Sequence, residues 1–117
     1  MPNAQSWDAV VASFRSLARA HAFYAPMSAA VDRLAASEHA PGLFPVRSMQ
    51  SLRLFQGAQY EVSDEEVFLA WEGAEFLVRY WGGPDRRQAW AKRGPDAQVL
   101  LQMAFDHVRW FVGREQP

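Results

Sequence analysis

Two apolar, aromatic-rich runs on either side of a short glycine-containing turn constrain this chain more than any other feature. The first run is Val67–Trp71, the second is Phe76–Trp81, and the segment between them, 72–75, reads Glu-Gly-Ala-Glu. β-Branched and aromatic residues favour strands, and glycine supplies the backbone freedom that a tight turn needs. The pattern therefore predicts an antiparallel β-hairpin, and the fold must bury at least one of its faces.

The two faces of this predicted hairpin differ, because side chains alternate between the faces of a strand. Every residue on one face is apolar: Val67, Leu69, Trp71, Phe76, Val78 and Tyr80. The other face is mixed and carries Glu66, Phe68, Ala70, Glu75, Leu77, Arg79 and Trp81. We expect helices to pack on the apolar face. The mixed face has more apolar area than a solvent-facing surface needs, so we expect another element, a second subunit or a partner to cover part of it.

The length of the loop sets the register of the hairpin and leaves two pairings open. With a loop of two residues, Glu66 lies opposite Arg79, and the opposite charges attract each other. With a loop of four residues, Glu66 lies opposite Trp81 instead. Both registers keep the same residues on the same face.

Helical periodicity marks the two ends of the chain. Apolar residues recur every three or four positions from Trp7 to His21, which predicts an amphipathic helix that ends near Ala22. A second apolar stripe predicts a helix over 27–37, so the N-terminal part is a helical hairpin. The last segment, 96–113, is broadly apolar, and Pro95 suits the first position of a long, mostly buried helix.

The region between these helices predicts one further strand. It covers Met49–Phe55, whereas 38–45 contains two prolines and a glycine and is expected to be a connection. The chain is therefore expected to be a single α+β domain over residues 1–117: an N-terminal helical hairpin, a three-stranded antiparallel sheet and a long C-terminal helix packed on the sheet. The expected core joins sheet residues to the last helix: Trp71, Phe76 and Val78 with Leu100, Met103, Phe105 and Phe111.

The composition excludes several classes of protein. The 117 residues contain no cysteine, which excludes disulfide scaffolds, zinc–cysteine sites and cysteine nucleophiles. The formal net charge of -1 argues against a general attraction to nucleic acid or to an anionic membrane. No window is apolar enough to cross a membrane and the N-terminus does not resemble a signal peptide, so we expect a cytoplasmic protein.

No catalytic or metal-binding motif stands out in the sequence. The glycines form neither a phosphate-binding loop nor a nucleophile elbow, and the three histidines have no metal-ligand spacing. We expect His21 and His107 to be buried on helix faces and His39 to lie in a loop. The sequence therefore predicts no cofactor and no metal, and it favours a protein without enzymatic activity.

Acidic and basic residues are segregated in the second half of the chain. Six acids and no cation lie between residues 61 and 75, and five cations against one acid lie between 79 and 93, around Trp90. We predict that these two stretches form a partner-binding surface, with the residues Asp64, Glu65, Glu72, Glu75, Arg86, Arg87, Trp90, Lys92 and Arg93. The alternative is structural: the charges neutralise each other across the hairpin, and Trp90 fills the core.

The predicted function is that of a small, non-catalytic protein-binding domain. Tryptophan and arginine are the residues most enriched in the energetic centres of protein interfaces. A bacterial inhibitor, immunity protein, antitoxin or chaperone has this size and character, and a homodimer through the mixed face of the sheet is a further option. Two alternatives remain. One is a small-ligand or nucleotide-binding domain or enzyme, in which Trp90 and the arginines line an anion pocket. The other is a nucleic-acid binder that uses the same stretch.

Overall fold

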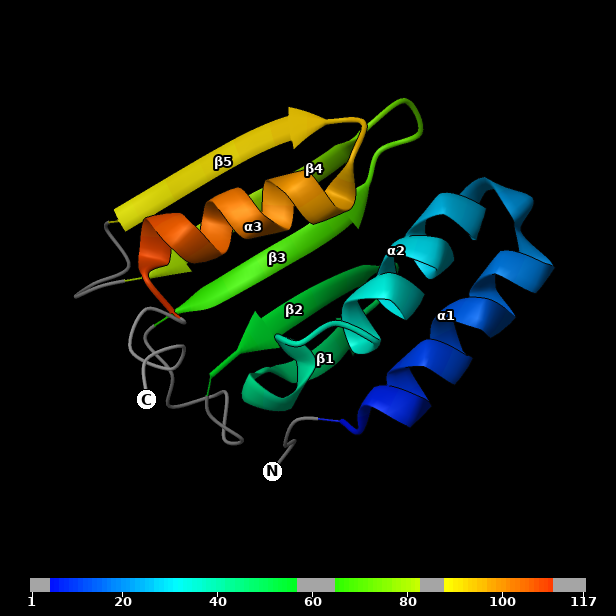
Figure 1. Ribbon diagram of the computed structural model, residues 1–117. Helices are drawn as coiled ribbons and strands as arrows, with labels where there is room; N and C mark the ends of the chain where they lie inside the picture. The colour runs from blue at the N-terminus through cyan, green and yellow to red at the C-terminus, as the bar shows by residue number, and fades with distance from the viewer. Residues whose placement is uncertain (1–4, 57–64, 83–87, 111–117) are drawn as a thin grey trace.

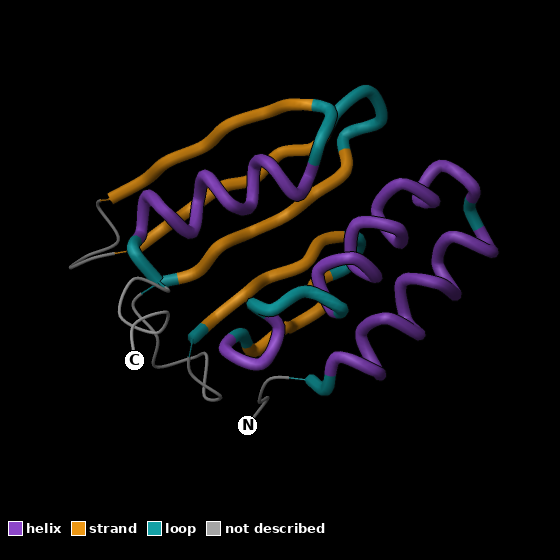
Figure 2. The backbone as a smooth tube through the Cα atoms, viewed as in Figure 1, coloured by secondary structure: helices purple, strands orange, loops and turns teal. Residues whose placement is uncertain are grey.

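The chain forms an α+β domain built on one five-stranded antiparallel sheet. The computed structural model describes residues 5–56, 65–82 and 88–110. The strands lie in chain order across the sheet: β1 (Phe44–Ser48), β2 (Ser51–Phe55), β3 (Glu66–Trp71), β4 (Phe76–Gly82) and β5 (Gln88–Gly94). The helices are α1 (Trp7–Ala20), α2 (Ala25–Ala35) and α3 (Ala97–Val108), and two single-turn 3₁₀ segments are η1 (Ala22–Tyr24) and η2 (Ala40–Gly42). All three α-helices lie on the same side of the sheet (Figures 1 and 2).

The predicted α+β class is confirmed, but the predicted three-stranded sheet is wrong. The region 38–45, expected to be a connection, contains the start of β1, and the basic stretch contains β5. Both missed strands are edge strands. Pro45 is tolerated in β1 because an edge position does not need its missing N–H, and β5 is rich in charge because its outer side faces solvent.

The C-terminal helix is shorter than predicted. α3 has 12 residues, and its end at Val108 precedes Arg109, whose φ of 59° lies in the left-handed region that terminates helices. Pro95 is not its first residue: Asp96 is the N-cap, because its carboxylate accepts the N–H groups of Gln98 and Val99. The predicted residues 111–113 lie outside the described part of the chain.

The N-terminal helical hairpin is confirmed. The side chain of Ser6 accepts the N–H of Ala9 and caps α1, and the last turn of that helix leads into η1. α2 begins at Ala25 rather than at 27, because Pro26 fits the first turn of a helix, where no N–H bond is lost.

The central hairpin has the four-residue loop. Glu66 lies opposite Trp81, and Phe68 lies opposite Arg79. The two-residue register, in which Glu66 would face Arg79, is therefore wrong. The predicted strand Met49–Phe55 begins later, at Ser51, because Met49 has a positive φ of 56° and forms the turn after β1.

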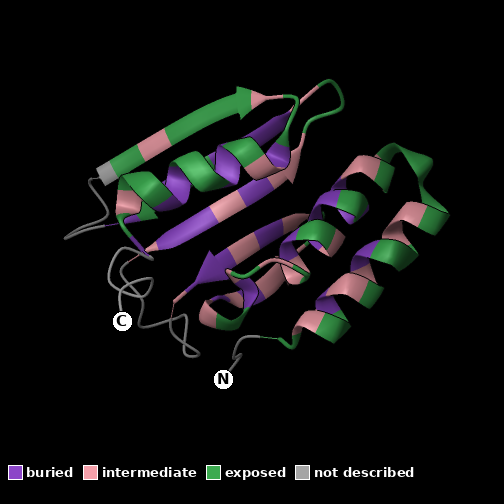
Figure 3. Ribbon diagram, viewed as in Figure 1, coloured by how far each residue is buried: buried purple, intermediate pink, exposed green. Residues whose placement is uncertain are grey.

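The core lies between the sheet and the helices, as the apolar face predicts. Its members include Val67, Leu69, Phe76, Val78 and Tyr80 of the sheet, with Leu100, Leu101, Ala104 and Phe105 of α3 (Figure 3). Trp71 is half-buried at its margin. Met103 is exposed, so its expected place in the core is wrong, and Phe111 lies outside the described residues. The expected burial of His21 and His107 is also wrong, since both are exposed.

Candidate functional site

The structure brings part of the predicted charged surface together. Glu72 and Glu75 flank the turn between β3 and β4, and Nε of Arg93 lies 2.7 Å from a carboxylate oxygen of Glu72. The hydrogen bond to Glu72 and its charge raise the pKa of Arg93 above its usual value. These two stretches of opposite sign therefore meet through an exposed ion pair. Asp64, Arg86 and Arg87 lie outside the described residues.

Trp90 and Lys92 lie on the other side of β5, toward the helices. The Trp90 ring packs against the core and stacks on His107 of α3, with 5.7 Å between the ring centroids. Lys92 is exposed two residues further along the same side. Trp90 and Arg93 thus point to opposite faces of the sheet, so β5 does not gather its aromatic and basic side chains into one pocket.

Glu65 has a structural setting at the start of β3. Its carboxylate accepts a hydrogen bond from Nε1 of Trp110, with an N···O distance of 2.6 Å. The same carboxylate lies beside Tyr80, and burial of the phenol, followed by the negative charge and hydrogen bonding of Glu65, raises the pKa of Tyr80. Glu65 therefore ties the end of the described chain to the sheet.

The mixed face of the central hairpin is the strongest candidate for a binding surface. None of the described helices lies on this face of the sheet. We call it the open face. The strand register aligns one row of residues across it, from Arg53 on β2 through Phe68 and Arg79 to Ala91 on β5. The outer rows add Trp81 and Leu77.

The two central arginines of the open face have different partners. Arg53 forms a two-pronged ion pair with Glu66, with both N···O distances 2.9 Å, and the Glu66 side chain is almost fully buried. Arg79 instead lies over the ring of Phe68, with its guanidinium carbon 4.5 Å from the ring centroid. No ion pair between described residues includes Arg79, and its side chain is exposed. The face thus presents one arginine that is held in place but available to a carboxylate.

Trp81 completes this arrangement. It lies two residues after Arg79 on the same strand and the same face, and 43% of its surface is exposed. Leu77, on the opposite side of Arg79, is nearly buried. The sequence pattern identified this mixed face, but it missed Arg53, because the β2–β3 pairing that brings Arg53 to Glu66 was not visible from the chain alone.

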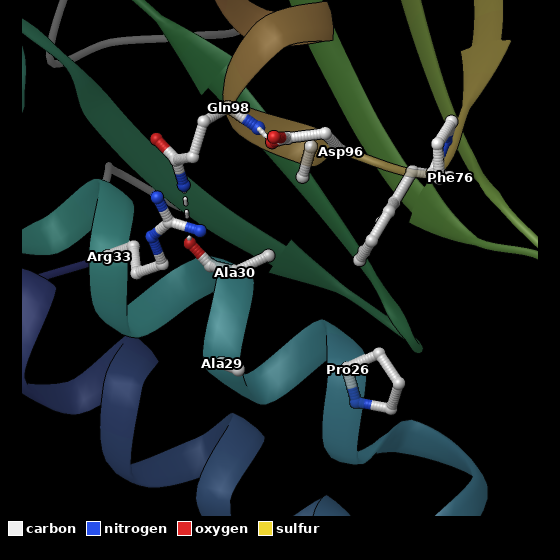
Figure 4. Close-up of a pocket in the computed structure, with 9 residues that line it drawn as sticks. Pro26, Ala29, Ala30, Arg33, Phe76, Asp96 and Gln98 are labelled. Carbon is white, nitrogen blue, oxygen red and sulfur yellow. Dashed lines mark hydrogen bonds between the residues drawn. The ribbon is translucent and has the colours of Figure 1, made fainter.

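A hollow of about 310 Å³ lies between α2 and the start of α3 (Figure 4). Its walls are Pro26, Ala29, Ala30, Arg33, Phe76, Pro95, Asp96, Ala97 and Gln98. Asp96 is already bound to backbone N–H groups, and Nε2 of Gln98 lies 3.5 Å from the carbonyl of Ala30. Among the described residues that line the hollow, Arg33 is the one cation and none is a tryptophan, so this lining does not resemble the anion pocket considered from the sequence.

Within the described residues, no group of three or more histidine, aspartate or glutamate side chains could hold a metal ion. None of the described helices is long and apolar enough to cross a membrane. Searches of family models, of curated proteins and of solved structures found no match to this chain.

Proposed function

We propose that the domain binds another protein through the open face of its sheet. The observation that carries this proposal is the pairing of Arg79, which lies over the ring of Phe68, with the partly exposed ring of Trp81 beside it. A small inhibitor, immunity protein or antitoxin would act in this way, without catalysis of its own.

The chemistry of the open face favours a partner that presents carboxylates. An arginine stacked on an aromatic ring keeps its N–H fork free for a planar anion and has already lost much of its conformational freedom. Trp81 adds a large apolar surface next to that charge, and tryptophan and arginine are the commonest centres of binding energy. An acidic patch with an apolar neighbour would match both.

The experiment compares proteins captured from the native host by the parent domain and by two variants of the open face. We expect Trp81→Ala and Arg79→Glu each to weaken binding of the same captured protein by at least about tenfold. Phe23→Ala and Arg19→Glu are matched controls, because both residues are exposed on the helical side. Thermal melting verifies that each variant is folded. Equal capture by all four variants would contradict the proposal.

The basic residues Arg86 and Arg87, which lie outside the described residues, remain predicted contact residues. Opposite charges steer a partner and raise its association rate more than the final affinity. Reversing both arginines to glutamate is expected to slow association with the captured partner while the melting temperature stays nearly unchanged. An unchanged association rate would restrict the contact surface to the open face.

A further inference from the structure

The two edge strands of the sheet differ in whether other described residues bond their outward backbone groups. The edge of β1 is closed by Gln5: its N–H donates to the carbonyl of Pro45, and its side-chain oxygen accepts the N–H of Arg47, both at 2.9 Å. Pro45 has no N–H to offer. An edge strand with unpaired N–H and C=O groups can pair with another strand. At β1, Gln5 occupies these groups of Pro45 and Arg47, so a further strand cannot pair there.

The register shows which residues of β5 turn their backbone groups outward. Successive residues of an antiparallel strand direct their N–H and C=O groups to opposite neighbours. The N–H of Glu72 donates to the carbonyl of Glu75, so the backbone groups of residue 75 are directed toward β3. By alternation, the backbone groups of the odd-numbered residues of β4 bond to β3, and those of the even-numbered residues bond to β5. The β5 residues opposite those even positions bond inward. Three residues therefore turn outward: Ala89, Ala91 and Arg93.

The same counting can be checked at the other edge. Applied to β3 and β2 in turn, the same alternation predicts that Pro45 and Arg47 of β1 direct their backbone groups outward. These are the two residues to which Gln5 is hydrogen-bonded. At β5, no backbone hydrogen bond of a described residue reaches the outward groups. Ala89, Ala91 and Arg93 are exposed, and β5 lies outermost in the sheet (Figures 1 and 3).

An apolar stripe on α3 runs above this open edge. Val99, Met103 and His107 are spaced four residues apart, so they share one side of the helix. His107 stacks on Trp90, which places this side over β5. The flank of α3 that carries Gln98 and Gln102 faces α2 and the segment after it, where Gln98 contacts Ala30 and Gln102 contacts His39. Val99 is 54% exposed and Met103 is 37% exposed.

We propose that two copies of this chain associate through their β5 edges, antiparallel and centred on Ala91, so that one ten-stranded sheet runs through the dimer. The two-fold axis then stands perpendicular to the sheet. Ala91 pairs with Ala91 of the second copy, and the α3 helices lie on the same side, with their apolar stripes facing each other.

The charges of β5 are compatible with a second copy of the strand and disfavour two of the possible registers. With Ala91 on the axis, Arg93 lies opposite Ala89 of the second copy and Lys92 lies opposite Trp90, whose ring attracts a cation. Centring the pairing on Lys92 or on Arg93 would oppose identical cations, which is unfavourable. Arg93 is also neutralised by Glu72 within its own chain. Pairing centred on Ala91 therefore avoids opposed cations and places each Lys92 opposite an aromatic ring.

The distance between the helices fits this dimer. Strands in a sheet are about 4.8 Å apart, so a helix above β5 would lie about 5 Å from its symmetry mate and a helix above β4 about 14 Å. α3 packs on both strands, and the usual separation of packed helices, about 8–10 Å, lies between these limits. Val99 and Met103 can then cover each other. An interface of this extent is at the small end, below about 1,200 Å², so we expect micromolar dissociation.

The absence of cysteine from the chain allows a direct test of the register. In the proposed dimer, Ala91→Cys places two cysteines with Cα atoms about 5.5 Å apart, within the range of a disulfide. Under mild oxidation we expect this variant to form a covalent dimer. Lys92→Cys, which would lie opposite Trp90, and Ala12→Cys, on the exposed side of α1, are expected to cross-link at least about tenfold more slowly. Equal rates for the three variants would overturn the register.

Sedimentation equilibrium of the parent chain tests the association itself. We expect the mass to rise toward that of two chains as concentration increases through the micromolar range. Ala91→Glu, which opposes two carboxylates on the axis, and Val99→Glu are each expected to weaken association at least about fivefold. Ala12→Glu, with the same change of charge on α1, is expected to leave it unchanged. A parent that stays monomeric, or a dimer that survives Ala91→Glu and Val99→Glu, would overturn the proposal.

Discussion

At the scale of single residues, Tyr80 shows how the chain uses a glycine and a carboxylate to hold one ring. Gly82 follows on the same side of β4, and a Cβ built on it would stand 2.5 Å from the Tyr80 hydroxyl oxygen. Only glycine allows the ring to lie this close to the strand, an arrangement in which an aromatic ring covers the exposed backbone. Glu65 then lies beside the hydroxyl and binds Trp110.

This environment predicts a dependence of stability on alkaline pH. Burial and the charge of Glu65 raise the pKa of Tyr80 above its ordinary value of 10.0. A raised folded-state pKa contributes stability that is complete below pH 10 and is lost as the pH rises through the folded pKa. We expect the free energy of unfolding to fall above pH 10 and Tyr80→Phe to reduce that fall. Denaturant titrations of both proteins across this range measure it, and parallel pH profiles would contradict it.

At the scale of elements, strand pairing decides which charges meet. The four-residue loop places Glu66 opposite Trp81, and the neighbouring strand β2 supplies its cation from Arg53. Arg79, which the shorter loop would have placed opposite Glu66, instead covers Phe68. The length of the turn therefore decides that Glu66 pairs with Arg53 in a nearly buried ion pair, while Arg79 lies over Phe68 with its side chain exposed.

A double-mutant cycle tests this pairing. We expect a coupling energy of about 1–3 kcal/mol between Arg53 and Glu66, because hydrogen bonds between charged groups out of water are strong. Glu66 and Arg79 are expected to show almost none. The cycles use Arg53→Met, Glu66→Gln and Arg79→Met, with free energies from denaturant unfolding. A larger coupling for the pair with Arg79 would favour the two-residue loop.

At the scale of the whole molecule, the helices of the described chain all lie on one side of the sheet. This arrangement buries the apolar face of β2–β4. The proposed partner would bind the open face, and the proposed second copy would bind the edge of β5, with the α3 stripe above it. The two proposed surfaces meet at Ala91, but Trp81 lies on β4 rather than on the β5 edge, so Trp81→Ala is expected to leave self-association intact.

The one-sided core makes Phe76 important for global stability. This residue is 6% exposed, belongs to the core and stacks at a tilt on Trp71, with 4.8 Å between their centroids. We expect Phe76→Ala to lower the free energy of unfolding by about 3–5 kcal/mol. The exposed aromatic Phe23 is the control, and Phe23→Ala is expected to cost less than about 1 kcal/mol. Similar losses for the two variants would show that Phe76 is not a core residue.

The sequence by itself determined the elements whose patterns are local. The stripe of α1 and the apolar runs of β3 and β4 each repeat with the period of their own secondary structure, so their existence and buried faces could be predicted. The mixed composition of the open face was visible for the same reason, including Phe68, Arg79 and Trp81. These features depend on neighbours along the chain, and no distant contact is needed to recognise them.

Only the tertiary structure decided the edges of the sheet. Pro45 in β1 and the charges of β5 disfavour strands, and each segment becomes a strand because it pairs with a neighbour that is already in place. The same applies to α3: its broad apolar pattern did not show that Met103 and His107 are exposed, since that depends on how the helix is rotated over β4 and β5. Which side of an element is buried there depends on contacts between segments far apart in the chain, and a local pattern carries no record of them.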